Sequence, residues 1–105
     1  MIAHLFVMYP TPKDPAAFER AYREEHLPYA GPRLKGATGL VSKRVASATG
    51  NPAYHAISDI SFPSMQALQA CAASQSGKEA LAHAASISTG GPPVIMIVTD
   101  DLVAS

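Results

Sequence analysis

The chain has 105 residues, of which 48% are hydrophobic and 15% are charged, so it has room for one core and is poor in charge. Eight Lys and Arg residues balance eight Asp and Glu residues, and this balance removes the attraction on which binding to nucleic acids or anionic membranes depends. The only cysteine, Cys71, excludes an intramolecular disulfide, and the N-terminal residues lack the features of a signal peptide, so we expect a cytoplasmic protein.

Residues 2–9 predict the first strand, because branched aliphatic and aromatic side chains dominate this run and prolines follow it closely. Asp14 before Pro15 is typical of a helix start, where an acidic cap is favoured and the missing N–H of proline has no cost. We therefore predict a helix over residues 15–26.

The predicted helix has one aromatic face. Phe18, Tyr22 and His26 recur at intervals of four residues, so we expect their side chains to point toward the core together. Pro28 predicts the end of regular helix. Residues 29–39 contain three glycines and one proline, and we expect them to form an irregular connector.

Two strand-like runs follow, at residues 40–48 and 54–62, and the turn-forming residues between them predict an antiparallel hairpin. The alanine-rich stretch after Pro63 predicts one helix that is broken near Gly77. Residues 94–98 are wholly apolar and rich in branched side chains, which is typical of a strand buried on both faces.

The resulting order of elements, βαββαβ, predicts one α+β domain of the ferredoxin-like type over residues 1–105. In this fold a four-stranded antiparallel sheet carries two helices on one face. The other face must be polar or covered, and residues 94–98 offer no polar alternation. We therefore predict a homodimer in which two sheets close face to face into a dimeric α/β barrel.

The sequence resembles the EthD-like family over nearly its whole length. The residues that carry the resemblance in the first half are Tyr9-Pro10, Phe18, Tyr22, His26-Leu27-Pro28 and Gly36. In the second half they are Tyr54 to Asp59, Phe62, Ser64 and the helix break Ser76-Gly77. Residues 83–87 depart from the pattern, which has an acidic residue and an aromatic residue there.

The resemblance implies a homodimer and no cofactor. Proteins that share the fold, as distinct from the family, include cofactor-free monooxygenases, isomerases and cyclases of small cyclic substrates, and haem-degrading enzymes, so the fold alone leaves the reaction open. The chain has no tryptophan, which the haem-degrading proteins use, and by this analogy we do not expect haem degradation.

His26 is the candidate catalytic residue. It shares the face of Phe18 and Tyr22 at the predicted helix end, where the helix dipole favours the imidazolium and burial disfavours it. Because these two effects oppose each other, the pKa of His26 is expected to stay near neutrality, which suits a proton shuttle. The alternative is a core histidine whose ring nitrogens bond backbone groups and fix the turn at Pro28.

Three further residues are candidates for substrate binding with Phe18. Tyr22 and Tyr9 could supply hydroxyl groups to the same cavity, although such tyrosines are also ordinary at the edge of a core. Asp59 stands in mid-strand, where an acid needs a partner if it is buried. By alternation it shares a face with His55, and it either orients His26 or lines the dimer barrel.

We expect the remaining polar candidates to have structural roles. His4 and His83 are predicted to be structural or solvent-exposed, with His83 on the exposed side of its helix. No histidine pair has the spacing of a metal site, so we predict no metal. Cys71 is predicted to act as a small buried hydrophobe, and the absence of a glycine-rich phosphate motif predicts no nucleotide.

The sequence therefore predicts a cofactor-free enzyme, or the ligand-handling component of one, acting on a small apolar or aromatic catabolite between helix and sheet. Oxidoreductase chemistry and isomerase or cyclase chemistry are the options. The competing hypothesis is a non-catalytic dimeric accessory or binding protein of a degradation pathway.

Overall fold

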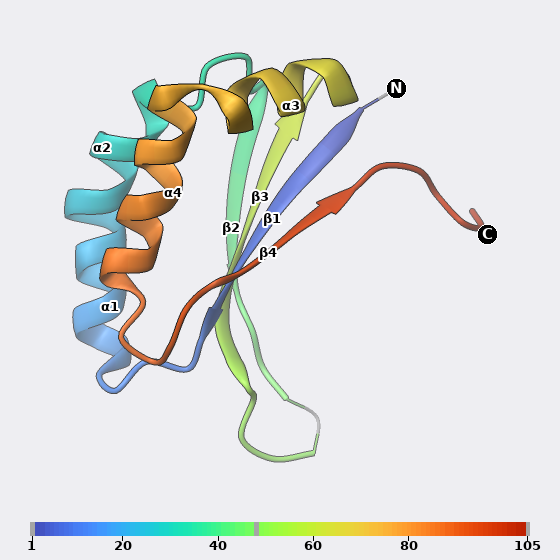
Figure 1. Ribbon diagram of the computed structural model, residues 1–105. Helices are drawn as coiled ribbons and strands as arrows, with labels where there is room; N and C mark the ends of the chain where they lie inside the picture. The colour runs from blue at the N-terminus through green and yellow to red at the C-terminus, as the bar shows by residue number, and fades with distance from the viewer. Residues whose placement is uncertain (1, 48, 105) are drawn as a thin grey trace.

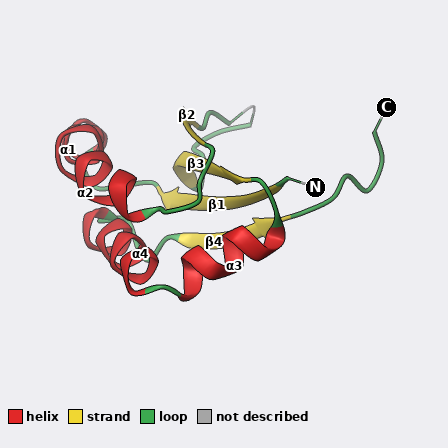
Figure 2. Ribbon diagram, turned by 90° about the horizontal axis from the view of Figure 1, so that it is seen from above, coloured by secondary structure: helices red, strands yellow, loops and turns green. Residues whose placement is uncertain are grey.

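The computed structural model describes residues 2–47 and 49–104. Its four-stranded antiparallel sheet has the order β2-β3-β1-β4 and carries the helices on one face (Figures 1 and 2). The strands are β1 (Ala3–Pro10), β2 (Gly39–Arg44), β3 (Tyr54–Phe62) and β4 (Val94–Val98). This arrangement confirms the predicted ferredoxin-like α+β fold.

Strand β1 lies inside the sheet and alternates strictly between its two faces. Ala3, Leu5, Val7 and Tyr9 are buried beneath the helices, whereas the residues between them are half-buried on the other side. The core is therefore the layer between helices and sheet.

The first helical crossing is longer than the sequence predicted. It runs through α1 (Pro15–Ala21), the π-helical turn η1 (Tyr22–His26), α2 (Leu27–Ala30) and the 3-10 turn η2 (Gly31–Arg33). Asp14 caps its start, as expected, by accepting a hydrogen bond of 3.1 Å from the N–H of Ala17.

The prediction that Pro28 ends regular helix was wrong. The N–H of Leu27 donates to the carbonyl of Tyr22 in the wider π-helical pattern. A proline ring ordinarily collides with the carbonyl four residues earlier, and a π turn just before it relieves that collision. The helical path therefore continues through Pro28, and the irregular connector begins only after Arg33.

The second crossing is the predicted broken helix, in two pieces named α3 (Met65–Ala73) and α4 (Gln75–Ile87). The break lies at Ser74, three residues before the expected Gly77. Ser74 is extended and caps α4, because its hydroxyl accepts a hydrogen bond of 3.0 Å from the N–H of Gly77.

The hairpin of β2 and β3 is confirmed, although β2 is shorter than predicted. It ends at Arg44, and Val45 still donates a backbone hydrogen bond of 2.8 Å to the carbonyl of His55. The predicted end of this strand, Ala48, lies outside the described residues.

Strand β4 is apolar, but its side chains are not buried within a single chain. The prediction that it is buried on both faces was therefore wrong for the isolated chain. Its five side chains are 37–50% exposed, because β4 is an edge strand that pairs only with β1. We call the side of the sheet without helices the open sheet face. Its side chains are His4, Phe6, Met8, Val41, Lys43, Ile57, Asp59, Ser61, Val94, Met96 and Val98.

Candidate functional site

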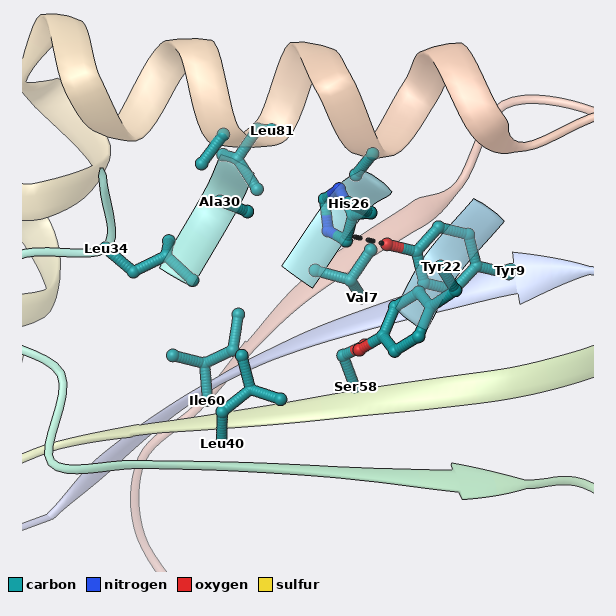
Figure 3. A pocket seen from close by; sticks show the side chains of 12 residues that line it. Val7, Tyr9, Tyr22, His26, Ala30, Leu34, Leu40, Ser58, Ile60 and Leu81 are labelled. Atoms are coloured by element: carbon teal, nitrogen blue, oxygen red, sulfur yellow. Dashed lines mark hydrogen bonds between the residues drawn. The ribbon is translucent and has the colours of Figure 1, made fainter. Parts of the chain in front are cut away.

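Three of the predicted site residues, Tyr9, Tyr22 and His26, line a small cavity between the helical layer and the sheet (Figure 3). The cavity has a volume of about 10 Å³, which is close to the least that accommodates one water molecule. Its lining is mostly apolar and comes from Val7, Tyr9, Tyr22, His26, Ala30, Leu34, Leu40, Ser58, Ile60, Ala80, Leu81 and Ala84.

Tyr9 is the member from the sheet in an aromatic cluster that also contains Phe18, Tyr22 and His26. It is fully buried, and the rings of Phe18 and Tyr22 pack against it at centroid distances of 5.0 and 5.8 Å. Burial, and to a lesser degree Tyr22, raises the pKa of its hydroxyl, so the group remains a proton donor. It lies 3.5 Å from Nε2 of His26. The structure thus brings Tyr9, Phe18, Tyr22 and His26 together, as the sequence predicted.

The hydroxyl of Tyr22 has two serine partners that sequence reasoning missed. It lies 2.6 Å from Oγ of the buried Ser58 and also contacts Ser42. Both serines are on neighbouring strands in direct register. A serine on the buried face of a strand needs such a partner, and this was the available signal for Ser58.

His26 is buried, with 7% of its surface exposed. Burial, together with the charge that His83 can carry, lowers the pKa of the His26 imidazole to about 4, so the ring is neutral at pH 7. The helix dipole was expected to favour the charged imidazolium of His26 at a helix end. This effect is missing, because the helical path continues from His26 to Arg33. A neutral ring can accept a proton at Nε2, which faces Tyr9.

His83 is not the exposed residue that the sequence predicted. It is half-buried on α4, and its Nδ1 lies 3.0 Å from Nδ1 of His26. Helix α4 runs beside α2 and passes over His26 (Figure 3), and the small residue Ala84 faces the cavity beside His83. Small residues allow such a close approach, but helical periodicity alone could not show which partner the imidazole would meet.

The structure separates Asp59 from this site. Asp59 lies on the open sheet face, where its carboxylate is 2.8 Å from Nδ1 of His4. Strand alternation left two roles open for Asp59, to orient His26 or to line the dimer barrel. In the structure Asp59 lines the sheet surface that is available to a second sheet, and it does not orient His26.

His55 does not share the face of Asp59, although strict alternation predicts that it should. The register shifts between Tyr9 and Pro10 opposite this part of β3, and the shift turns the His55 side chain toward α1. There its Nε2 lies 2.8 Å from Glu19. Arg44 also donates two hydrogen bonds of 2.7 Å to the Glu19 carboxylate. The contacts with Arg44 and His55 lower the pKa of the Glu19 carboxyl to about 2.

Cys71 is buried, as predicted, and burial raises the pKa of its thiol. Among residues 2–47 and 49–104 there is no group of three or more His, Cys, Asp or Glu side chains arranged to hold a metal ion. Within the same ranges, no helix has both the length and the apolar character needed to cross a bilayer.

Comparison with known proteins gives one curated relative. No family model matches the sequence. A stretch of 96 residues is 30% identical to an uncharacterized 11.0 kDa protein encoded in the thcB-thcC intergenic region of Rhodococcus erythropolis, and it covers 90% of each chain.

Solved structures of EthD proteins have the same fold. An EthD family protein from Bacillus halodurans matches with a TM-score of 0.82 at 22% identity, over 96% of this chain and all of its own. An EthD-like protein from Ralstonia eutropha matches with a TM-score of 0.70 at 22% identity, over 93% of this chain and 90% of its own.

More distant structures share the fold as well. A dimeric ferredoxin-like protein of unknown function from Jannaschia matches with a TM-score of 0.63 at 16% identity, over 94% of this chain and 98% of its own. SnoaB from Streptomyces nogalater, a cofactor-independent oxygenase, matches with a TM-score of 0.62 at 13% identity, over 97% of this chain and 94% of its own.

Proposed function

The chain belongs to the same family as the Rhodococcus erythropolis protein and has the fold of the EthD proteins, and from this premise we propose that it is a cofactor-free enzyme. In this proposal His26 removes a proton from a small apolar or aromatic molecule held between the helices and the sheet. The observation that supports it most is the buried imidazole of His26, whose Nε2 faces a mostly apolar cavity and whose pKa is lowered to about 4 by burial.

Proton abstraction is the step that the candidate reactions share. Without a metal or flavin, dioxygen must take electrons from the substrate itself, and a substrate supplies them readily only as an anion. An isomerase or cyclase of an enolisable ring begins with the same anion. The fold neighbour that is a cofactor-independent oxygenase favours the first of these reactions, and the assignment to His26 holds for either.

The size of the cavity sets a condition on this proposal. A site for a small organic ligand usually has a volume of roughly 300 Å³ or more, far above the 10 Å³ found here. A ligand must therefore displace the half-buried Leu40 and Leu81 side chains, which form part of the wall. The small size of this cavity favours the second candidate function, a dimeric accessory protein that carries out no chemistry.

Two further parts of the proposal concern the whole protein. We propose a homodimer joined through the open sheet face, because Val94, Met96 and Val98 of β4 are 37–43% exposed there in a single chain. Fold neighbours of this chain are dimeric. A cytoplasmic location stays a prediction.

The proposal is tested with 2-tetralone, a small aromatic ketone whose enolisable C–H bonds exchange with deuterium when a base removes the proton. Exchange in D₂O is followed by NMR for the wild type, for His26→Gln and for His55→Gln. His55 pairs with Glu19 away from the cavity, so its variant is the matched control. We expect the wild type and the control to accelerate exchange, and His26→Gln to lose about 100-fold or more of that acceleration.

Other outcomes separate the two candidate functions. Ligand-induced changes in the His26 NMR signals without any acceleration of exchange would support the accessory protein. Equal acceleration by the wild type and His26→Gln would remove His26 from the chemistry and refute the proposed mechanism.

A further inference from the structure

The two histidines of the site are joined edge to edge. Their Nδ1 atoms are 3.0 Å apart, their ring planes differ by 13°, and their centroids are 5.2 Å apart. Rings stacked face to face could not place an N–H in line with the acceptor nitrogen, whereas coplanar rings do so at this centroid distance. One imidazole therefore donates an N–H···N hydrogen bond to the other.

His83 is held in this position from the side that faces solvent. The ring of Tyr29 stacks on it at 4.5 Å and 23°, and the guanidinium of Arg33 lies 3.6 Å from the centre of the Tyr29 ring. Arg33 is fixed in turn by its hydrogen bond to the Tyr29 carbonyl and by Glu79, whose carboxylate is 3.5 Å away. The contacts orient the His83 ring while leaving it half-exposed.

We propose that His83 is the relay partner of His26 and carries protons between the cavity and solvent. This inference rests on the proposed function of His26. It adds a second residue to the site, and it explains how a buried base can exchange protons with water.

In the resting state of the proposed relay, the hydrogen bond runs from His26 to His83. His26 carries its proton on Nδ1 and donates it to the Nδ1 lone pair of His83, which carries its own proton on Nε2. Nε2 of His26 is then unprotonated and accepts a long hydrogen bond of 3.5 Å from the hydroxyl of Tyr9 at the cavity.

The relay step is balanced in atoms and charge. When Nε2 of His26 takes a proton from the bound molecule, the Nδ1–H bond of His26 breaks and an N–H bond forms at Nδ1 of His83. The positive charge moves from the buried ring to the half-exposed ring, and Nε2–H of His83 then releases a proton to water. The reverse sequence returns a proton from water to the product.

The surroundings of the two rings favour this direction of transfer. His26 faces Tyr9 and Tyr22, and burial disfavours its charged form. Beyond His26, the groups near His83 are Tyr29 and the oppositely charged pair of Arg33 and Glu79. Since Arg33 is already neutralised by Glu79 and His83 is open to water, His83 is the better place for a transient charge.

The hydrogen bond itself is tested without any activity measurement. In protein labelled with ¹⁵N, an N–H···N bond between the rings gives a scalar coupling between the two Nδ1 nuclei, and the ¹⁵N shifts show which nitrogens carry protons. We expect that coupling, with Nε2 of His26 unprotonated at pH 7. A protonated Nε2 on His26, or independent rings without coupling, would overturn the relay.

The transfer is tested with His83→Gln and the 2-tetralone exchange assay. A glutamine side chain can still accept a hydrogen bond from Nδ1 of His26, but it cannot carry a proton onward, so a purely structural role would be preserved. We expect a loss of about 10-fold or more, whereas the dependence of exchange on the neutral form of His26 should remain in the pH profile.

Chemical rescue completes the test. We expect free imidazole to restore exchange to His83→Ala, because the vacated position is open to solvent, and to leave His26→Gln unaffected. If the wild type is active and His26→Gln is not, full activity of His83→Gln at every pH refutes the relay alone. If His26→Gln matches the wild type, the proposed function itself has failed, and the NMR coupling still reports on the pair.

Discussion

Gly77 and Cys71 approach so closely that a Cβ atom at position 77 would lie 1.9 Å from the carbonyl oxygen of Cys71. The contact lies where α3 gives way to α4 across Ser74, so a rigid backbone atom blocks any larger residue. We predict that Gly77→Ala lowers the free energy of unfolding by about 1–3 kcal/mol or more, as measured by urea denaturation.

Gly31→Ala is the matched control for this prediction. Gly31 is also helical, with φ −50°, and a Cβ there meets no atom within 4 Å. Alanine at such a position should be neutral or should stabilise by roughly 0.4–1 kcal/mol. If both variants unfolded at the wild-type urea concentration, the backbone contact at Gly77 would be disproved.

The open sheet face predicts the assembly state. Met96 pairs directly with Phe6 on this face and is 43% exposed in a single chain. We expect light scattering to show a dimer for the wild type and a monomer for Met96→Lys, because an unpaired charge would have to enter the interface. Obligate interfaces of this type usually bury roughly 2,000 Å² or more.

Leu102→Lys is the control for a general effect of an added positive charge on assembly. Leu102 is 99% exposed beyond β4, so Leu102→Lys should remain dimeric. A wild-type monomer at micromolar concentration would leave the apolar face unexplained and would rule out the dimeric barrel for this chain.

The carboxylate of Glu19 predicts a loss of stability in strong acid. Its pKa is lowered from 4.5 to about 2 by Arg44 first and then by His55. The stabilisation is therefore complete above pH 4.5 and is lost as the pH falls toward 2. In thermal melts over this range, the wild type should lose more stability than Glu19→Gln. High salt should narrow the difference, because the pair lies near water, and identical pH curves would contradict the assignment.

The elements of the fold were predictable because local chemistry and periodicity agree with the tertiary structure. Asp14 caps the first helix, β2 and β3 pair as an antiparallel hairpin, and residues 54–62 form the predicted strand. The same patterns could not distinguish an edge strand from a central one, since the apolar run of β4 is equally consistent with burial against a neighbour in the sheet or against a second molecule.

The site was only partly predictable for a different reason. Phe18, Tyr22 and His26 are close in sequence, so helical spacing was sufficient to group them. His83 comes from another helix, and its contact with His26 depends on how α4 crosses α2. His55 departs from the face of Asp59 because of a register shift in the sheet, and no pattern within β3 indicates that shift.

The ionisation of His26 gives a prediction in a separate pH range. Its pKa in the folded protein is lowered from 6.5 to about 4, chiefly by burial. Between these two pKa values the unfolded chain binds a proton at His26 and the folded chain does not. The contribution of the neutral ring to stability is therefore complete above pH 6.5 and falls as the pH drops toward 4. In urea unfolding at pH 7.5, 6 and 5, the wild type should weaken more steeply than His26→Gln. An NMR titration measures the same group directly, and a His26 ring that titrates near 6.5 would show that the site is wet and would remove the argument for a buried neutral base.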